Sequence, residues 1–150
     1  MKEVTLAFVK PDAFKHRKEI RARYLEKGLE IVAEKQLKMD RRLAEKFYGE
    51  HRGSPHFEPN ILHNVSGRIW AMIIHGENAI ARVRRINGAT DPDKAEPGTI
   101  RWDYGTHNVG PINPRNAVHS SDSEASAERE IDLFFGTGAY ERFKKYCGSV

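Results

Sequence analysis

The sequence is poor in cysteine: Cys147 is the one cysteine among its 150 residues, so no disulfide can form within the chain. This composition favours a reducing compartment. No apolar run approaches the roughly 20 residues that a helix needs to span a bilayer. The N-terminal stretch has an acid at Glu3 and reaches Lys-Pro-Asp by Asp12, without the apolar core of a signal peptide. These absences predict a cytoplasmic protein with no membrane partner.

The histidines lack the spacing of a common metal site. His51, His56 and His63 fit no frequent zinc pattern, and no cysteine joins them. The run His119-Ser120-Ser121-Asp122 is a poor candidate for a hydrolase triad, because triad members come from separate elements of a fold. We therefore expect neither a metal site built by histidines nor a serine hydrolase.

The composition is that of a polar globular protein. Hydrophobic residues make up 39% and charged residues 31%, which is too apolar for a disordered chain. The length suits one domain over residues 1–150. The net charge of +4 suits an anionic ligand, and it does not distinguish a nucleotide from a nucleic acid.

Hydrophobic patterning predicts alternating strands and helices. Strands that are apolar on both faces are predicted over Val4–Val9 and Arg68–Ile74. A strand with alternating apolar and polar residues is predicted over Leu29–Met39, and a brief fourth strand over Asn116–His119. Helices are predicted over His16–Lys27, from a cap at Asp40, in a short segment after residues 52–60, over Gly76–Asn87, and after a Ser121/Glu124 capping box. A long ordered loop is expected at about 88–114, and residues 136–150 are weakly patterned.

The order of these elements contains two strand–helix–strand units. Such an order predicts an α/β (α+β) fold, a ferredoxin-like βαββαβ sandwich whose four-stranded antiparallel sheet is covered by helices. The first and third strands are central in that arrangement, and these are the two strands that are apolar on both faces.

Several side chains suit phosphoryl transfer, which needs cations and oriented donors more than covalent machinery. The candidates are Lys10 after a strand, Arg84 near a helix end, Thr90 and Arg101 in the long loop, and His119 before a helix N-terminus. A neutral imidazole is a nucleophile near pH 7, and Glu130 is spaced to fix its tautomer from the next helix. Each of these residues alone is more simply a solvated surface group.

Five stretches resemble the nucleoside diphosphate kinase family in order and nearly in spacing. They are VKPDA (9–13), EHRGSPHF (50–57), GATDP (88–92), PGTIRWDY (97–104) and NAVHSSDS (116–123). The resemblance covers residues 3 to 135. It implies a ping-pong enzyme in which His119 takes the terminal phosphate of a nucleoside triphosphate and passes it to a nucleoside diphosphate.

The resemblance also implies roles for single residues. Lys10 would bind the phosphate and the sugar hydroxyls, Tyr48 would contact the transferred phosphate, and Asn116 would contact the 3′-hydroxyl of the sugar. Ser121 would support Glu130, and Glu130 would orient His119. The phosphate chain would be held by His51, Arg84, Thr90 and Arg101. Mg²⁺ would arrive with the nucleotide phosphates, and the family implies a homo-oligomer, typically a hexamer, with a tetramer or dimer as alternatives.

The chain departs from the family pattern where the nucleobase binds. His56 stands where the family usually has a base-stacking aromatic residue, and Asn60 replaces a nearby aliphatic one. About five extra residues lie between Tyr104 and Asn116, with Val109 as a candidate to cover the other face of the base. The alternative function is a non-catalytic nucleotide- or nucleic-acid-binding protein on the same fold, although no strand carries the paired aromatics of single-strand binders.

Overall fold

The computed structural model describes residues 1–148, and four antiparallel strands form its sheet in the order β2-β3-β1-β4. The strands are β1 (Lys2–Val9), β2 (Glu30–Lys38), β3 (Arg68–Glu77) and β4 (Val118–Ser120). β1 pairs with β3 along its whole length and with β4 at Ala7–Val9. The predicted ferredoxin-like arrangement, with the first and third strands central, is confirmed.

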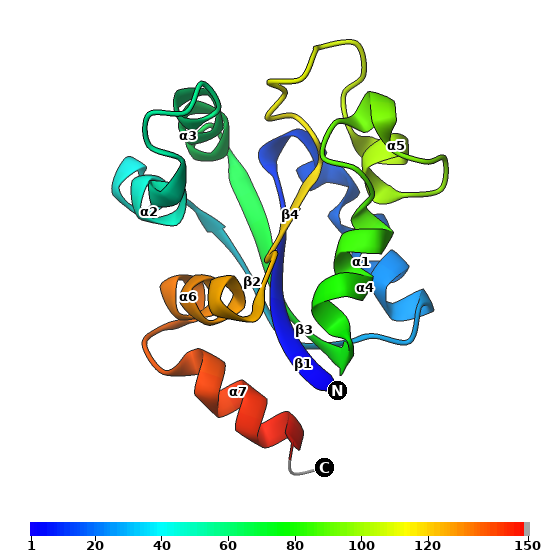
Figure 1. Ribbon diagram of the computed structural model, residues 1–150, viewed down its shortest axis with the longest axis vertical. Helices are drawn as coiled ribbons and strands as arrows, with labels where there is room; N and C mark the ends of the chain where they lie inside the picture. Colours follow the sequence, from blue (N-terminus) through cyan, green and yellow to red (C-terminus); the bar gives the residue numbers. More distant parts are fainter. Residues whose placement is uncertain (149–150) are drawn as a thin grey trace.

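Helices cover both faces of the sheet (Figure 1). The α-helices are α1 (Arg17–Glu26), α2 (Arg41–Phe47), α3 (Phe57–Val65), α4 (Ala79–Asn87), α5 (Ile100–Tyr104), α6 (Glu124–Phe135) and α7 (Ala139–Gly148). Short 3₁₀ segments are η1 (Pro11–His16), η2 (Gly49–His51) and η3 (Pro92–Lys94). Seen along the sheet edge, α2, α3, α6 and α7 lie on one side, and α1, α4 and α5 lie on the other.

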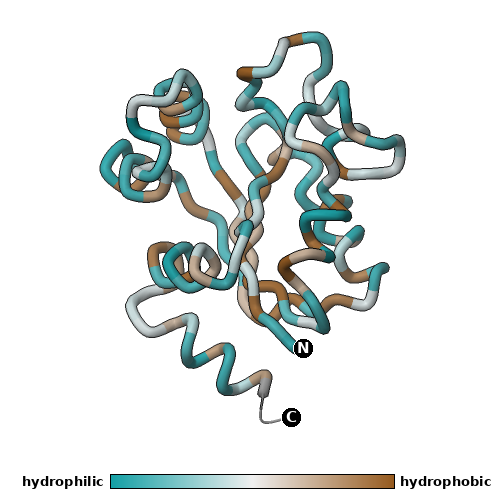
Figure 2. The backbone as a smooth tube through the Cα atoms, viewed as in Figure 1, coloured by the Kyte–Doolittle hydropathy of each residue, from teal (hydrophilic) through white to brown (hydrophobic). Residues whose placement is uncertain are grey.

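The central strands divide the core into two apolar layers. Alternate side chains of β1 point to opposite faces, so Leu6 and Phe8 pack under α6 while Ala7 and Val9 pack under α1 and α4. Figure 2 shows the apolar colouring gathered along the sheet and on the helix surfaces that face it. Among the described residues, no helix has the length and apolarity that crossing a membrane requires.

Several predicted boundaries differ from the structure. β3 runs to Glu77, where a helix was expected from Gly76, because Gly76 and Glu77 pair with Glu3 and Lys2 of β1. The helix predicted over His16–Lys27 is α1 (Arg17–Glu26), and the 3₁₀ segment η1 before it was not predicted. The brief last strand is β4 (Val118–Ser120) rather than 116–119. The weakly patterned tail folds as α7 as far as Gly148, with Ser149 and Val150 outside the described residues. The loop at 88–114 contains η3 and α5.

Candidate active site

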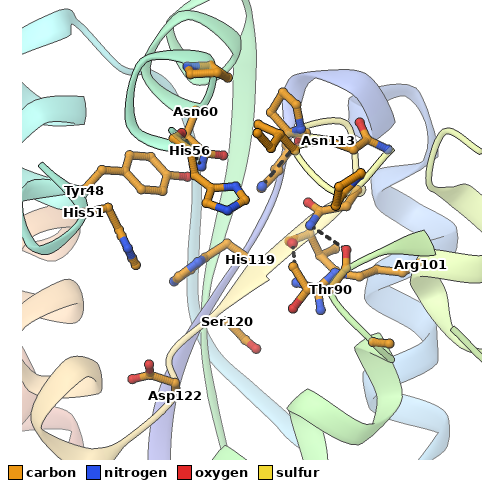
Figure 3. A pocket seen from close by; sticks show the side chains of 18 of the residues that line it. Tyr48, His51, His56, Asn60, Thr90, Arg101, Asn113, His119, Ser120 and Asp122 are labelled. Carbon is orange, nitrogen blue, oxygen red and sulfur yellow. Dashed lines mark hydrogen bonds between the residues drawn. The ribbon is translucent and has the colours of Figure 1, made fainter. Parts of the chain in front are cut away.

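A cleft of about 460 Å³ gathers most of the predicted site residues from distant parts of the sequence. It is bordered by the end of β1, the α2–α3 region, the end of α4, α5 and β4 (Figure 3). The predicted residues that line it are Lys10, Tyr48, His51, His56, Asn60, Arg84, Thr90, Arg101, Asn116 and His119. Ser121 and Glu130 lie behind His119 instead of in the lining, in contact with each other.

His119 is held between two aromatic rings. It pairs with Phe8 across the β1–β4 ladder, and its ring stacks on the Phe8 ring with centroids 5.0 Å apart. The Phe47 ring packs against it in a T-shaped arrangement, with ring centroids 4.7 Å apart. The side chain of His119 is 22% exposed, so the ring is fixed by packing while one edge stays open to the cleft.

A buried carboxylate determines which nitrogen of His119 is available. Glu130 on α6 lies 2.8 Å from Nε2 through Oε1, and its side chain is 5% exposed. Ser121 donates its hydroxyl to the same Oε1 at 2.9 Å. Because a carboxylate accepts hydrogen bonds, Nε2 carries the proton and Nδ1 keeps its lone pair. The geometry therefore leaves Nδ1 as the nitrogen with a free lone pair.

Lys10 brings a buried amine to the cleft. Lys10 is 5% exposed, and its Nζ donates to the carbonyl of Pro114 at 3.4 Å. Burial, and secondarily the positive charge of Arg101, lowers the pKa of Lys10 from its usual 10.5 to about 7, although Asp12 offsets part of this effect. A phosphate entering the cleft would place a negative charge beside this amine and so favour its protonated form.

Arg101 is fixed by backbone carbonyls. Its two Nη atoms donate to Gly88 at 2.8 Å and to Val118 at 2.9 Å, so the guanidinium ties the end of α4 to β4. Burial lowers its pKa to about 10, and the nearby charge of Arg84 adds to this effect. Arg84 itself is exposed at the cleft rim. Two guanidinium groups are thus positioned for the oxygens of one phosphate chain.

Asn116 offers an unused acceptor in the cleft lining. It is 4% exposed, and its Nδ2 donates to the carbonyl of Thr90 at 3.0 Å. Its Oδ1 is buried without a partner among the described residues. A buried acceptor without a partner is costly, so a ligand hydroxyl is the group that would satisfy it.

Tyr48 remains a neutral phenol. Its hydroxyl accepts a hydrogen bond of 2.9 Å from Asn64 Nδ2, which leaves its own proton free to donate. Burial raises the pKa of Tyr48, and the charge of Glu130 raises it further. Tyr48 therefore acts as a donor on the His119 side of the cleft.

The wider end of the cleft lies between α3 and the segment 105–115. His56 is exposed there, and Asn60 donates Nδ2 to the His56 carbonyl at 2.9 Å, so this amide is engaged within α3. Val109, the expected residue for the far wall, does not line the cleft. Pro111, Ile112, Asn113 and Pro114 form that wall, after a segment with positive φ values at Asn108 (63°) and Gly110 (105°).

The turn before His119 is shaped by residues that were not among the predicted site residues. Ala117 has a φ of 72°, a left-handed conformation that alanine rarely adopts. Its N–H donates to Asp12 Oδ2 at 3.0 Å, while Asp12 Oδ1 lies 2.8 Å from His63 Nε2. Both side chains of this pair are less than one-tenth exposed. Asp12 and His63 therefore hold the backbone that places His119.

Ser120 and Asp122 also line the cleft without having been predicted. Asp122 Oδ1 accepts from the Ser126 hydroxyl, and this contact together with the charge of Arg84 lowers the pKa of Asp122. Within the part of the chain that the structure describes, no three His, Cys, Asp or Glu side chains gather as metal ligands.

The sequence and the fold both have counterparts in known proteins. A family model described as nucleoside diphosphate kinase matches residues 3–139. The chain is 49% identical over 137 residues to the nucleoside diphosphate kinase of Methanocaldococcus jannaschii, covering 90% of this chain and 94% of the relative. It is 46% identical over 147 residues to that of Thermococcus kodakarensis, covering 97% and 82%.

Solved structures agree with these sequence matches. The nucleoside diphosphate kinase of Aquifex aeolicus superposes with a TM-score of 0.84 at 36% identity, covering 93% of this chain and 99% of that one. A halophilic nucleoside diphosphate kinase from Halobacterium salinarum, solved in complex with CDP, has a TM-score of 0.83 at 38% identity and covers 93% and 91%.

Proposed function

The chain belongs to the nucleoside diphosphate kinase family, and on this basis we propose that His119 carries the phosphate in its reaction. The enzyme transfers the terminal phosphate of a nucleoside triphosphate to a nucleoside diphosphate, as the sequence resemblance predicted. The observation that supports His119 as the carrier is its contact with buried Glu130 through Nε2, which leaves Nδ1 with a lone pair at the cleft.

The proposed reaction has two displacements. Nδ1 of His119 attacks the terminal phosphorus, the bond from that phosphorus to the bridging oxygen breaks, and the nucleoside diphosphate leaves. An acceptor diphosphate then attacks the phosphohistidine with its terminal oxygen, and the N–P bond breaks. Glu130 stabilises the positive charge on the imidazole in each direction.

The other predicted residues have roles around this transfer. Lys10, Tyr48, Arg84 and Arg101 would stabilise the charge on the phosphate oxygens as the group moves. The buried Oδ1 of Asn116 would accept from a sugar hydroxyl. His51 and Thr90 line the same end of the cleft and would contact the phosphate chain, whereas His56 lies at the wider end, where the base would bind.

Mg²⁺ fits this site as a companion of the substrate. The phosphate end of the cleft is lined by cations and neutral donors with one carboxylate, Asp122, which is engaged by Ser126. A divalent ion needs several oxygen ligands, which nucleotide phosphates and water supply. Mg²⁺ would neutralise charge on those phosphates, and the roles given above to the protein side chains do not depend on it.

We also propose that the protein works in the cytoplasm as a homo-oligomer of single-domain subunits. The single cysteine, Cys147, is buried and free, which suits a reducing compartment. The edge strand β2 is largely unburied and has one strand neighbour, β3, so its outer backbone edge is available to a second copy.

The test is incubation with γ-labelled ATP followed by denaturation. We expect a labelled protein whose phosphate is lost in acid and kept in base, and no label in His119→Ala. His16→Ala, which changes a histidine outside the cleft lining, is the matched control and should label like the wild type. A wild type that takes up no label would instead support the non-catalytic nucleotide-binding alternative.

A further inference from the structure

Three polar side chains form a buried chain of hydrogen bonds that ends at the cleft. Tyr24 on α1 donates its hydroxyl to Asn87 Oδ1 at 2.6 Å, and Asn87 on α4 donates Nδ2 to the Ser120 hydroxyl at 3.0 Å. Tyr24 and Asn87 are fully buried. Ser120 lines the cleft directly after His119 (Figure 3).

The Tyr24 hydroxyl and the Asn87 amide are unusual because they are polar groups buried in an apolar layer of the core. Tyr24 lies in the apolar layer with residues such as Ile20 and Val83, where a hydroxyl or amide without a partner would be strongly destabilising. Burial raises the pKa of Tyr24, so its proton stays in place. The chain of bonds therefore has a fixed direction, from Tyr24 through Asn87 to Ser120.

The direction of these bonds determines what Ser120 can do. A serine hydroxyl has one proton and can both donate and accept. Since its oxygen accepts from Asn87, its proton is directed away from α4 and remains available as a donor. Alternation along β4 places this hydroxyl on the opposite face from the His119 ring, toward α4.

That face is the one on which the phosphate-binding guanidinium groups lie. Arg101 donates to the carbonyl of Val118, two residues before Ser120. Arg84 precedes Asn87 by three residues on α4, which places it about one turn away on the same side of the helix. An anion held by Arg84 and Arg101 would therefore lie beside the Ser120 hydroxyl.

We propose that Ser120 is a further catalytic residue, which donates its hydroxyl proton to a phosphate oxygen of the bound nucleotide, and that Tyr24 and Asn87 are positioning residues that aim it. The inference rests on the proposed phosphotransfer at His119. The hydroxyl forms no covalent bond and loses no proton; it adds an oriented donor to those of Lys10, Arg84 and Arg101.

The experiment measures the single-turnover rate at which saturating ATP phosphorylates His119. Loss of a donor to a charged oxygen corresponds to a decrease of about ten- to a hundredfold, which we expect for Ser120→Ala. Tyr24→Phe should decrease the rate by a smaller factor in the wild type and by none in the Ser120→Ala background, since Tyr24 acts through Ser120. Ser123→Ala, a serine of the same segment outside the cleft lining, should keep the wild-type rate.

Three results would overturn the proposal. If Ser120→Ala unfolds at a lower urea concentration but keeps the wild-type rate of His119 phosphorylation, Ser120 only anchors β4 to α4. The rate effects of Tyr24→Phe and Ser120→Ala could multiply, which would separate the two residues. Wild-type rates in both single variants would also exclude it. Failure of the wild type to label would refute the carrier role of His119 instead, so the two failures are distinguishable.

Discussion

Burial changes the protonation of the Lys10 amine. In the unfolded chain its pKa is near 10.5, whereas burial and the charge of Arg101 lower it to about 7 in the folded protein. Between these values the unfolded state binds more protons, so the contribution of Lys10 to stability improves as pH rises from about 7 to 10.5. Below about pH 7 the amine is charged in both states, and its burial opposes folding in full.

Nucleotide binding should reverse this shift. A phosphate chain next to Lys10 favours the charged amine, so binding of ADP at about pH 8 should take up protons, and the affinity should fall as pH rises above about 7. Calorimetry in two buffers of different ionisation enthalpy measures the uptake. Lys10→Met should remove both effects, and Lys18→Met, which changes an exposed lysine, should keep them. Equal heats in both buffers for the wild type would contradict the prediction.

Asp12 supports the strained backbone of Ala117, directly before β4. Its two oxygens bind the Ala117 N–H and His63, and the left-handed conformation of Ala117 persists because this contact holds it. An amide in place of the carboxylate can accept through one atom only, so both contacts survive only if the amide nitrogen donates to His63 and the His63 ring changes its tautomer.

We therefore expect Asp12→Asn to lower the free energy of unfolding by about 1–3 kcal/mol. Urea denaturation measures this as a lower midpoint at unchanged slope. Glu128→Gln, which neutralises an exposed carboxylate, should leave the midpoint in place. An unchanged midpoint for Asp12→Asn would show that Ala117 keeps its conformation without this contact.

Two roles that the sequence assigned to Ser121, capping α6 and supporting Glu130, belong to two different serines. The capping-box pattern predicted Ser121 as the cap, but the structure places Ser123 there, with its hydroxyl accepting from the Ser126 N–H at 3.1 Å. Ser121 cannot cap because its N–H is paired with Leu6 of β1 and its side chain points inward to Glu130. Strand pairing, which is a long-range contact, overrides the local motif.

The two serines should respond differently to truncation. Ser123→Ala should decrease stability by about 1 kcal/mol, the typical value of a helix cap, with phosphorylation of His119 unchanged. Ser121→Ala should slow phosphorylation, since Glu130 loses a donor that holds its position. Chemical denaturation and single-turnover labelling of both variants test this. Equal effects of the two variants on the rate would contradict it.

The segment 105–115 is ordered by a histidine outside the cleft. His107 lies 2.7 Å from Asp93 through Nδ1 and 2.8 Å from the Trp102 carbonyl through Nε2. Both partners are acceptors, so both nitrogens donate only when the ring is protonated. The Trp102 carbonyl, together with Asp93, raises the pKa of His107.

Order in this segment should therefore depend on pH. The contribution of His107 is complete below its unfolded pKa of about 6.5 and is lost as pH rises through the higher folded value. Amide exchange at Thr106 and Asn108, corrected for the intrinsic effect of pH, should speed up over that range. In His107→Ala exchange should be fast at every pH, with a larger KM for nucleoside diphosphates. Protection that is equally strong in the variant would rule out this role.

On the scale of the whole molecule, the order and type of the main elements could be predicted because β1 and β3 are buried on both faces. Such strands are uniformly apolar, which sets them apart from the alternating pattern of β2. The tail was missed because α7 packs against a core formed by the rest of the chain. Its apolar residues, among them Tyr140 and Cys147, become informative only once the sheet and α6 are in place.

The candidate site was predicted through residues that match family motifs, and those residues do gather at one cleft. The missed ones depend on three-dimensional detail. Ser120 faces the cleft because of the register of β4, and the far wall belongs to a segment that His107 holds through its contacts with Asp93 and Trp102. Neither property can be read from spacing along the chain.

The pairing of β1 with β4 has a consequence for synthesis of the protein. Residues 7–9 of the first strand meet their partners only at residues 118–120. A ribosome adding about 5–20 residues per second would need on the order of 5–20 s to make the intervening stretch. Throughout that interval β1 has a backbone edge without its partner and His119 does not yet exist. The first strand of the nascent chain is thus exposed to wrong pairings until residues 118–120 have been synthesised.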